Sequence, residues 1–132
     1  MQTNNAIREY VGIQKESMSG RELEASVLTK AGLMLKSCQE NWEAPDRESK
    51  LLDAIKFNQK VWSFFQAELS EPDNPMPKKL REDILNLSLF VDKRFFEVMA
   101  YPDRDKLSIV IDINFNIAAG LRTNPESASQ AG

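Results

Sequence analysis

The chain has 132 residues, the usual size of one domain with a single hydrophobic core. Hydrophobic residues make up 42% and charged residues 28%, which excludes a disordered chain, and no apolar run approaches the roughly 20 residues of a transmembrane helix. The formal net charge of −3 argues against general nucleic-acid binding, which needs a basic surplus gathered on one face.

Residues 1–18 are predicted to form a partly ordered N-terminal segment ahead of a helical domain at residues 19–122. The segment lacks a basic stretch followed by an apolar one, so we expect a cytoplasmic protein. The first helix is predicted at residues 20–42, and Ser19 with Glu22 forms a capping-box pattern at its start. Its apolar residues recur at helical spacing: Leu23, Val27, Ala31, Leu35, Cys38 and Trp42.

Pro45 ends this helix, and a second one is predicted from about Asp46 to Leu69. One face of the second helix carries an inner stripe, which consists of Leu51, Ile55, Asn58, Trp62, Phe65 and Leu69. A second apolar stripe lies beside the first and consists of Phe57, Val61 and Phe64.

Three prolines in residues 70–77 predict a loop, and Pro77 suits the first turn of a third helix that ends before Pro102. The inner line of the third helix is Leu80, Ile84, Leu87, Val91, Phe95 and Val98. Its second apolar line is Leu85, Leu89, Phe96 and Met99, with Phe90 near the edge.

Asp103 is a candidate cap for a fourth, shorter helix that continues to Leu121. Its first half is rich in Ile and Val, as strands are, but its length and the alanines that follow favour a helix. The expected inner stripe is Leu107, Val110, Asn114, Ile117 and Leu121. Residues 123–132 are predicted to be a disordered polar tail. The pattern predicts an all-α bundle of three long helices plus a shorter C-terminal helix.

A small bundle cannot bury two apolar stripes on each of three helices, so some of this surface is expected to stay accessible. Partner binding is therefore predicted at Phe57, Val61, Phe64, Leu85, Leu89 and Phe96. The partner would be another helix or a second copy of the chain, giving a homodimer. The alternative is that the N-terminal segment folds back and covers this surface.

Asn58 and Asn114 are the polar exceptions on two inner stripes. An unpaired buried amide would cost about 1 to 3 kcal/mol, so each must find a partner. One interpretation is that they bond each other or a nearby backbone carbonyl and form a structural polar core. The alternative is direct contact with a ligand.

Little in the sequence supports catalysis. The chain has no histidine, and its only cysteine, Cys38, lies on an apolar stripe with no second thiol. The basic cluster of Lys78, Lys79 and Arg81 is either a solvated helix start or a contact for an acidic partner or RNA. We therefore expect a non-enzymatic protein with no metal and no cofactor.

Four motifs occur in a fixed order: RELE at 21–24, NQKVW at 58–62, MPKKLREDILNLSLFV at 76–91 and IDINFNIAAGL at 111–121. Their order and spacing resemble the FlaF family, flagellar biosynthesis regulators of α-proteobacteria. The resemblance covers roughly residues 10–122. Two residues depart from the family pattern, since Gly20 stands where Pro is common and Phe90 where Trp is common.

The resemblance implies a cytoplasmic protein that promotes flagellin synthesis and export, in opposition to a companion regulator, FlbT. Apolar helix surfaces would bind flagellin in the manner of a chaperone. Two alternatives remain open: contact with flagellin mRNA through the basic cluster, or action through FlbT. The family supplies no catalytic residues.

Overall fold

Four α-helices and one short 3₁₀ helix make up the part of the chain that the computed structural model describes, residues 20–123. Their bounds are α2 Gly20–Glu40, α3 Arg47–Leu69, α4 Lys78–Ala100, η1 Arg104–Leu107 and α5 Ser108–Thr123. The predicted all-α fold of three long helices and a shorter fourth is confirmed. The predictions for residues 1–18, for the capping residue Ser19 and for the tail beyond Thr123 lie outside the described residues.

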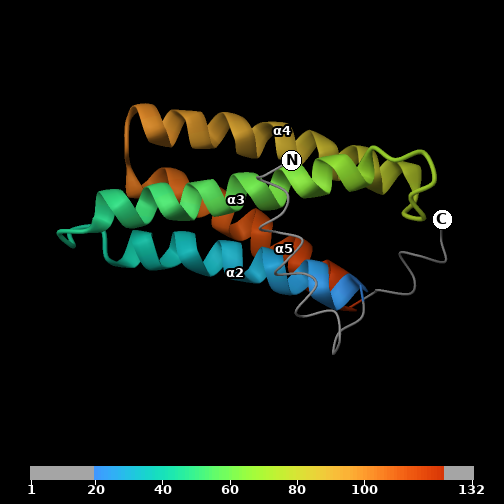
Figure 1. Ribbon diagram of the computed structural model, residues 1–132, viewed down its shortest axis with the longest axis horizontal. Coiled ribbons are helices and arrows are strands. Elements are labelled where there is room, and N and C mark those ends of the chain that lie inside the picture. Colours follow the sequence, from blue (N-terminus) through green and yellow to red (C-terminus); the bar gives the residue numbers. More distant parts are fainter. Residues whose placement is uncertain (1–19, 124–132) are drawn as a thin grey trace.

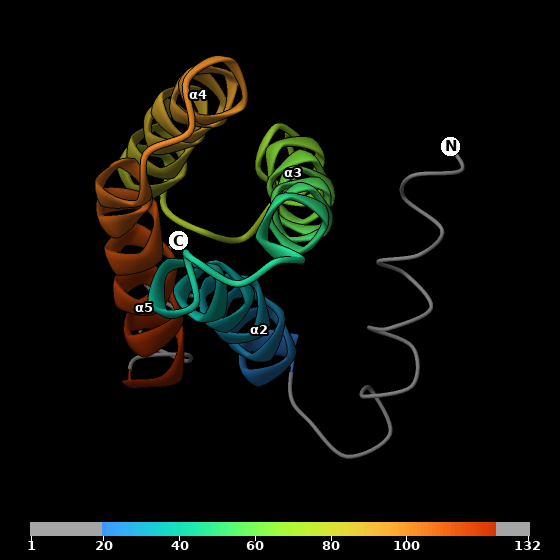
Figure 2. The ribbon, with the colours of Figure 1, turned by 90° about the vertical axis from the view of Figure 1, so that its left-hand side faces the viewer.

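Consecutive helices run in opposite directions along the bundle (Figure 1). α5 crosses behind the others at an angle, from the end of α4 toward the start of α2, and it packs mainly against α2. The view along the bundle places α4 at a corner, where it packs mainly against α3 (Figure 2). The four helices therefore enclose one core, and α4 is the helix with the most open outer side.

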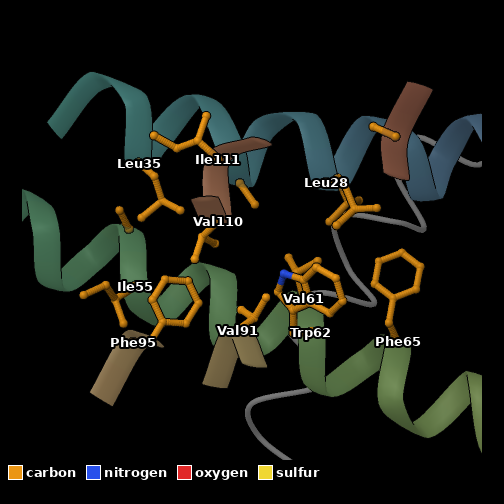
Figure 3. Packing of buried hydrophobic residues seen from close by; sticks show 14 of the residues in the cluster. Leu28, Leu35, Ile55, Val61, Trp62, Phe65, Val91, Phe95, Val110 and Ile111 are labelled. Atoms are coloured by element: carbon orange, nitrogen blue, oxygen red, sulfur yellow. The ribbon is translucent and has the colours of Figure 1, made fainter. Parts of the chain in front are cut away.

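The core gathers between the inner faces of the helices, where Leu28 and Leu35 of α2 approach Trp62 of α3 and Val110 of α5 (Figure 3). All six residues of the predicted inner stripe of α3 are buried, which confirms that stripe. Five of the six α2 residues in the first stripe are also buried, and Trp42 is half-buried beyond the helix end. Helical periodicity therefore identified the core-facing sides of both helices.

The inner line predicted for α4 is wrong at two positions. Leu80 is 39% exposed and Leu87 is 37% exposed, whereas Ser88 is buried. Ser88 can be buried because its hydroxyl donates to the carbonyl oxygen of Leu85 at 2.6 Å, which satisfies its polar group within the helix. In α5, Ile111 and Ala118 are buried while the predicted Ile117 is only half-buried.

The fourth helix is preceded by a tighter turn than the sequence predicted. The carboxylate of Asp103 accepts from the backbone amide of Asp105 at 2.9 Å, so it caps η1 and not α5. The α-helical region then begins at Ser108, which confirms a helix where the composition also resembled a strand. Within residues 20–123, no helix has the length and apolar character required to cross a bilayer.

Candidate partner-binding surfaces

The outer face of α4 carries the most exposed apolar residues among those predicted to bind a partner. Leu89 and Phe96 are each 65% exposed, and Leu85 on the same side is half-buried. Because these residues are four and seven positions apart, they follow one line along the helix. We name Leu85, Leu89 and Phe96 the α4 face. It is accessible in the isolated chain, as the sequence predicted for its second apolar line.

The second stripe of α3 is much less accessible. Val61 is fully buried, so the expectation that it would be available to a partner is wrong. Val61 is buried because the flank of α3 on which it lies packs into the core together with the inner stripe. Phe57 and Phe64 are half-buried and pack against the same core.

The remaining surface of Phe57 and Phe64 is shaped by neighbouring residues. The Lys30 ammonium of α2 lies 5.2 Å from the centre of the Phe57 ring. The ring of Phe64 meets Phe65 edge to face, with the ring centres 6.0 Å apart. Phe57 and Phe64 therefore contribute mainly to helix packing, with part of each ring left at the surface.

The two predicted stripes lie on different sides of the molecule. Phe57 is on the flank of α3 that faces α2, as its contact with Lys30 shows. Gln66 is on the flank of α3 that faces α4, because its Nε2 donates to Oδ2 of Asp92 at 3.1 Å. The structure thus does not bring Phe57 and Phe64 into one groove with the α4 face.

A shallow depression of about 590 Å³ lies beside Phe96 at the C-terminal end of α4. It is lined by Lys93, Arg94, Phe96, Glu97, Ala100, Tyr101 and Lys106. Tyr101 is 77% exposed and was not singled out by the sequence analysis. Its position between the end of α4 and Pro102 is the signal that could have placed it outside the packed helix.

Most of the basic cluster at the start of α4 is engaged within the chain. Lys79 Nζ pairs with Oδ1 of Asp83 at 2.8 Å on the surface. Arg81 Nε donates to the carbonyl oxygen of Met76 at 2.9 Å and so fastens the preceding loop to the helix. Lys78 is exposed. Two of the three cations therefore have local structural partners.

Asn58 and Asn114 form a buried network with Trp62 at the centre of the bundle. Asn114 Nδ2 donates to Asn58 Oδ1 at 2.7 Å, and Trp62 Nε1 donates to Asn114 Oδ1 at 3.0 Å. Asn58 Nδ2 donates to the carbonyl oxygens of Ala31 and Ala54. All three side chains are almost completely buried. The two amides thus bond each other and the backbone, which is the first of the two interpretations drawn from the sequence.

The hydrogen bond with Asp83 raises the pKa of Lys79, whereas burial is the main cause of the pKa shifts of Cys38 and Glu24. Burial raises the pKa of the Cys38 thiol, which keeps it in the less nucleophilic protonated form. Burial also raises the pKa of Glu24, although Arg21, 3.1 Å away, lowers it in part. Within residues 20–123, no group of three or more His, Cys, Asp or Glu side chains has the arrangement of a metal site.

Comparison with known proteins gives one match. A family model described as "Flagellar protein FlaF" matches residues 6–121, which is most of the chain. No curated protein and no solved structure matches it.

Proposed function

Because the chain belongs to the FlaF family of flagellar proteins, we propose that it promotes flagellin synthesis and export by binding flagellin as a chaperone-like adaptor. The binding site is the α4 face, and its occupant is an amphipathic helix of flagellin that has not yet been assembled. The observation that carries this proposal is the 65% exposure of both Leu89 and Phe96 on the open side of α4.

The spacing of the α4 face supports helix-to-helix recognition. Residues four and seven positions apart on a helix form a straight apolar line, which matches the apolar line of a second amphipathic helix. Burying each large apolar side chain contributes roughly 1.5 to 3 kcal/mol. Two such anchors contribute roughly 3 to 6 kcal/mol. The cost of association is about 4 kcal/mol or more, so the anchors supply only part of the binding energy and the complex is expected to be weak and reversible, as export of the bound flagellin requires.

The other predicted surfaces support binding less well. Phe57 and Phe64 are half-buried in helix packing, so they offer a smaller apolar area. RNA contact through the basic cluster is disfavoured because Lys79 and Arg81 already have partners within the chain. Action through FlbT remains the second route, with the α4 face as its docking site.

The test is a calorimetric titration of monomeric flagellin into the protein and into Leu89→Ser and Phe96→Ser. Each substitution removes one anchor, so we expect the Kd to rise at least about tenfold. Leu33→Ser is the matched control, because Leu33 is 53% exposed on α2, away from the α4 face. Circular dichroism confirms that each variant is folded.

Equal flagellin affinity in all four proteins would remove the α4 face from the proposal. Absence of any complex between the unsubstituted protein and flagellin, together with capture of FlbT, would favour the FlbT route.

A further inference from the structure

An apolar flank follows the line along which α2 and α3 meet. At one end it holds a depression of about 470 Å³, to which α2 contributes Met34 and Cys38 and α3 contributes Ala54. Phe57 lies three residues after Ala54, and Phe64 seven residues after Phe57, so both rings continue the same flank of α3. We name the depression, together with the half-buried Met34, Phe57 and Phe64, the α2/α3 flank.

We propose that residues 4–17 of this chain cover the α2/α3 flank, as an amphipathic helix that folds back from the start of α2. These residues come shortly before Gly20, the first residue of α2, and lie outside the described residues. The match to the FlaF family begins at residue 6, so it includes most of this segment. The segment therefore belongs to the part of the chain that is shared with the family.

The sequence of the segment has the pattern of a helix with one apolar side. Ile7, Tyr10 and Val11 fall within about 100° of one another around a helix, whereas Glu9 and Glu16 fall on the opposite side. An isolated helix of this length is marginal in water, so it needs an apolar surface on which to pack. The half-buried rings of the α2/α3 flank are such a surface.

The length of the segment matches the length of the flank. Asn58 Nδ2 donates to the carbonyl oxygen of Ala31 at 3.0 Å, which sets these two positions at the same level along the bundle. A helix that folds back along α2 after a turn at residues 17–19 passes about one residue of α2 for each of its own. Ile7 then arrives beside Phe57, and residue 4 reaches Met34 at the near end of the depression.

The covalent link to α2 selects this segment over a partner in solution. A tethered helix meets the flank at an effective concentration on the order of millimolar, which a free protein seldom reaches in a cell. The α4 face stays open, because the flank of α3 that carries Phe57 faces α2, whereas the flank that carries Gln66 faces α4. The inference is therefore independent of the proposed function.

The first experiment tests the position of the segment by disulfide formation in the full chain. Ile7→Cys with Phe57→Cys should form a disulfide within one chain in a glutathione redox buffer, because the packing brings the two positions together. Glu9→Cys with Phe57→Cys is the matched control, since position 9 points away from the flank, and it should cross-link at least about tenfold more slowly. Ile7→Cys with Leu89→Cys tests whether the segment covers the α4 face instead. Cys38→Ala removes the native thiol from all three pairs.

The second experiment measures amide hydrogen exchange in the full chain without any cysteine substitution. Amides of residues 7–16 should exchange at least about tenfold more slowly than those of a synthetic peptide of residues 1–19, because helix formation and packing protect them. Ile7→Ser with Val11→Ser should return the exchange to near the rate of the peptide, and Glu9→Ser should keep the protection. Amides of α3, followed in the same run, report whether the bundle remains folded.

Exchange of residues 7–16 at the rate of the peptide in the unsubstituted chain would overturn the proposal. So would faster cross-linking of Ile7→Cys with Leu89→Cys than with Phe57→Cys, which would place the segment on the α4 face. Disulfide-linked dimers on a non-reducing gel, in place of cross-linked monomers, would mean that the segment of a second copy fills the flank, and would overturn packing within one chain. Titration with flagellin tests the proposed function separately.

Discussion

Asn114 of α5 donates to Asn58 of α3 at 2.7 Å, although the two residues are 56 positions apart in the sequence. The same Asn114 side chain accepts from the Trp62 ring nitrogen at 3.0 Å. The residues are almost completely buried, so each hydrogen bond satisfies a group that water cannot reach. This network fixes how α5 sits against α3.

Asn114→Leu should be strongly destabilising, because it leaves Asn58 Oδ1 and the Trp62 N–H unpaired in the core. At roughly 1 to 3 kcal/mol for each unpaired group, we expect a loss of about 3 kcal/mol or more in the free energy of unfolding. Adding Trp62→Phe removes one of these unpaired groups, so the double variant should lose less than the sum of the two single variants. Urea denaturation of all four proteins measures this coupling, and strict additivity would show that the network is not energetically connected.

Truncation of Val61 and truncation of Phe57 should lower the free energy of unfolding to different extents. Val61→Ala should lower the free energy of unfolding by roughly 2 kcal/mol, because it removes fully buried methyl groups. Phe57→Ser should lower the free energy of unfolding by less per atom removed than Val61→Ala does, since part of the Phe57 ring lies at the surface. Urea denaturation checks both, and Lys60→Ala on the same helix is the control. A neutral Val61→Ala would contradict the burial of this side chain.

Gly32 permits the close approach of α2 and α5. A Cβ at this position would lie 2.6 Å from Cε1 of Phe115, whereas a Cβ at Gly120 would meet nothing within 4 Å. Gly120→Ala should therefore gain up to about 1 kcal/mol from helix propensity alone. Gly32→Ala has the same propensity gain but displaces the Phe115 ring, and we expect a net loss of about 1 kcal/mol.

Thermal denaturation compares the two alanine variants under identical conditions. Adding Phe115→Ala to Gly32→Ala should abolish the clash. The loss of stability in the double variant should therefore be smaller than the sum of the losses in the two single variants. If Gly32→Ala were as stabilising as Gly120→Ala, the helices would not be in contact at this point.

Glu24 should make the stability of the protein depend on pH. Burial raises its pKa above the ordinary value of 4.5, so the folded state holds this proton more tightly than the unfolded state does. The resulting stabilisation is fully present below the ordinary pKa and is lost as the pH rises through the folded-state pKa. Glu24→Gln cannot ionise and should lack this dependence.

Urea midpoints of the two proteins at pH 4 and at pH 7 test the sign. The urea midpoint of Glu24→Gln minus that of the unsubstituted protein should be larger at pH 7 than at pH 4. An opposite trend would mean that the ion pair with Arg21 outweighs the burial of the carboxylate.

The sequence predicted which residues share each apolar stripe, but it did not distinguish the exposed stripe of α4 from the stripe of α3 in which Val61 is buried. The pattern placed Leu85, Leu89 and Phe96 on one side of α4 because spacing alone fixes which residues share a helix face. The same reasoning placed Val61 on a second stripe of α3 and wrongly expected it to be exposed. Periodicity gives directions around one helix, and it does not say how many neighbours that helix has.

The sequence by itself determined the helical class, the positions of the four helices and the buried stripe of α3, since these depend on local propensity, prolines and the helical repeat. The tertiary structure decided which of the surplus apolar residues stay exposed. It did so by packing α5 against α2, burying Val61 within the core and leaving α4 at a corner. Exposure is a property of neighbouring helices, so only their arrangement could separate the core from the surface that is open to a partner.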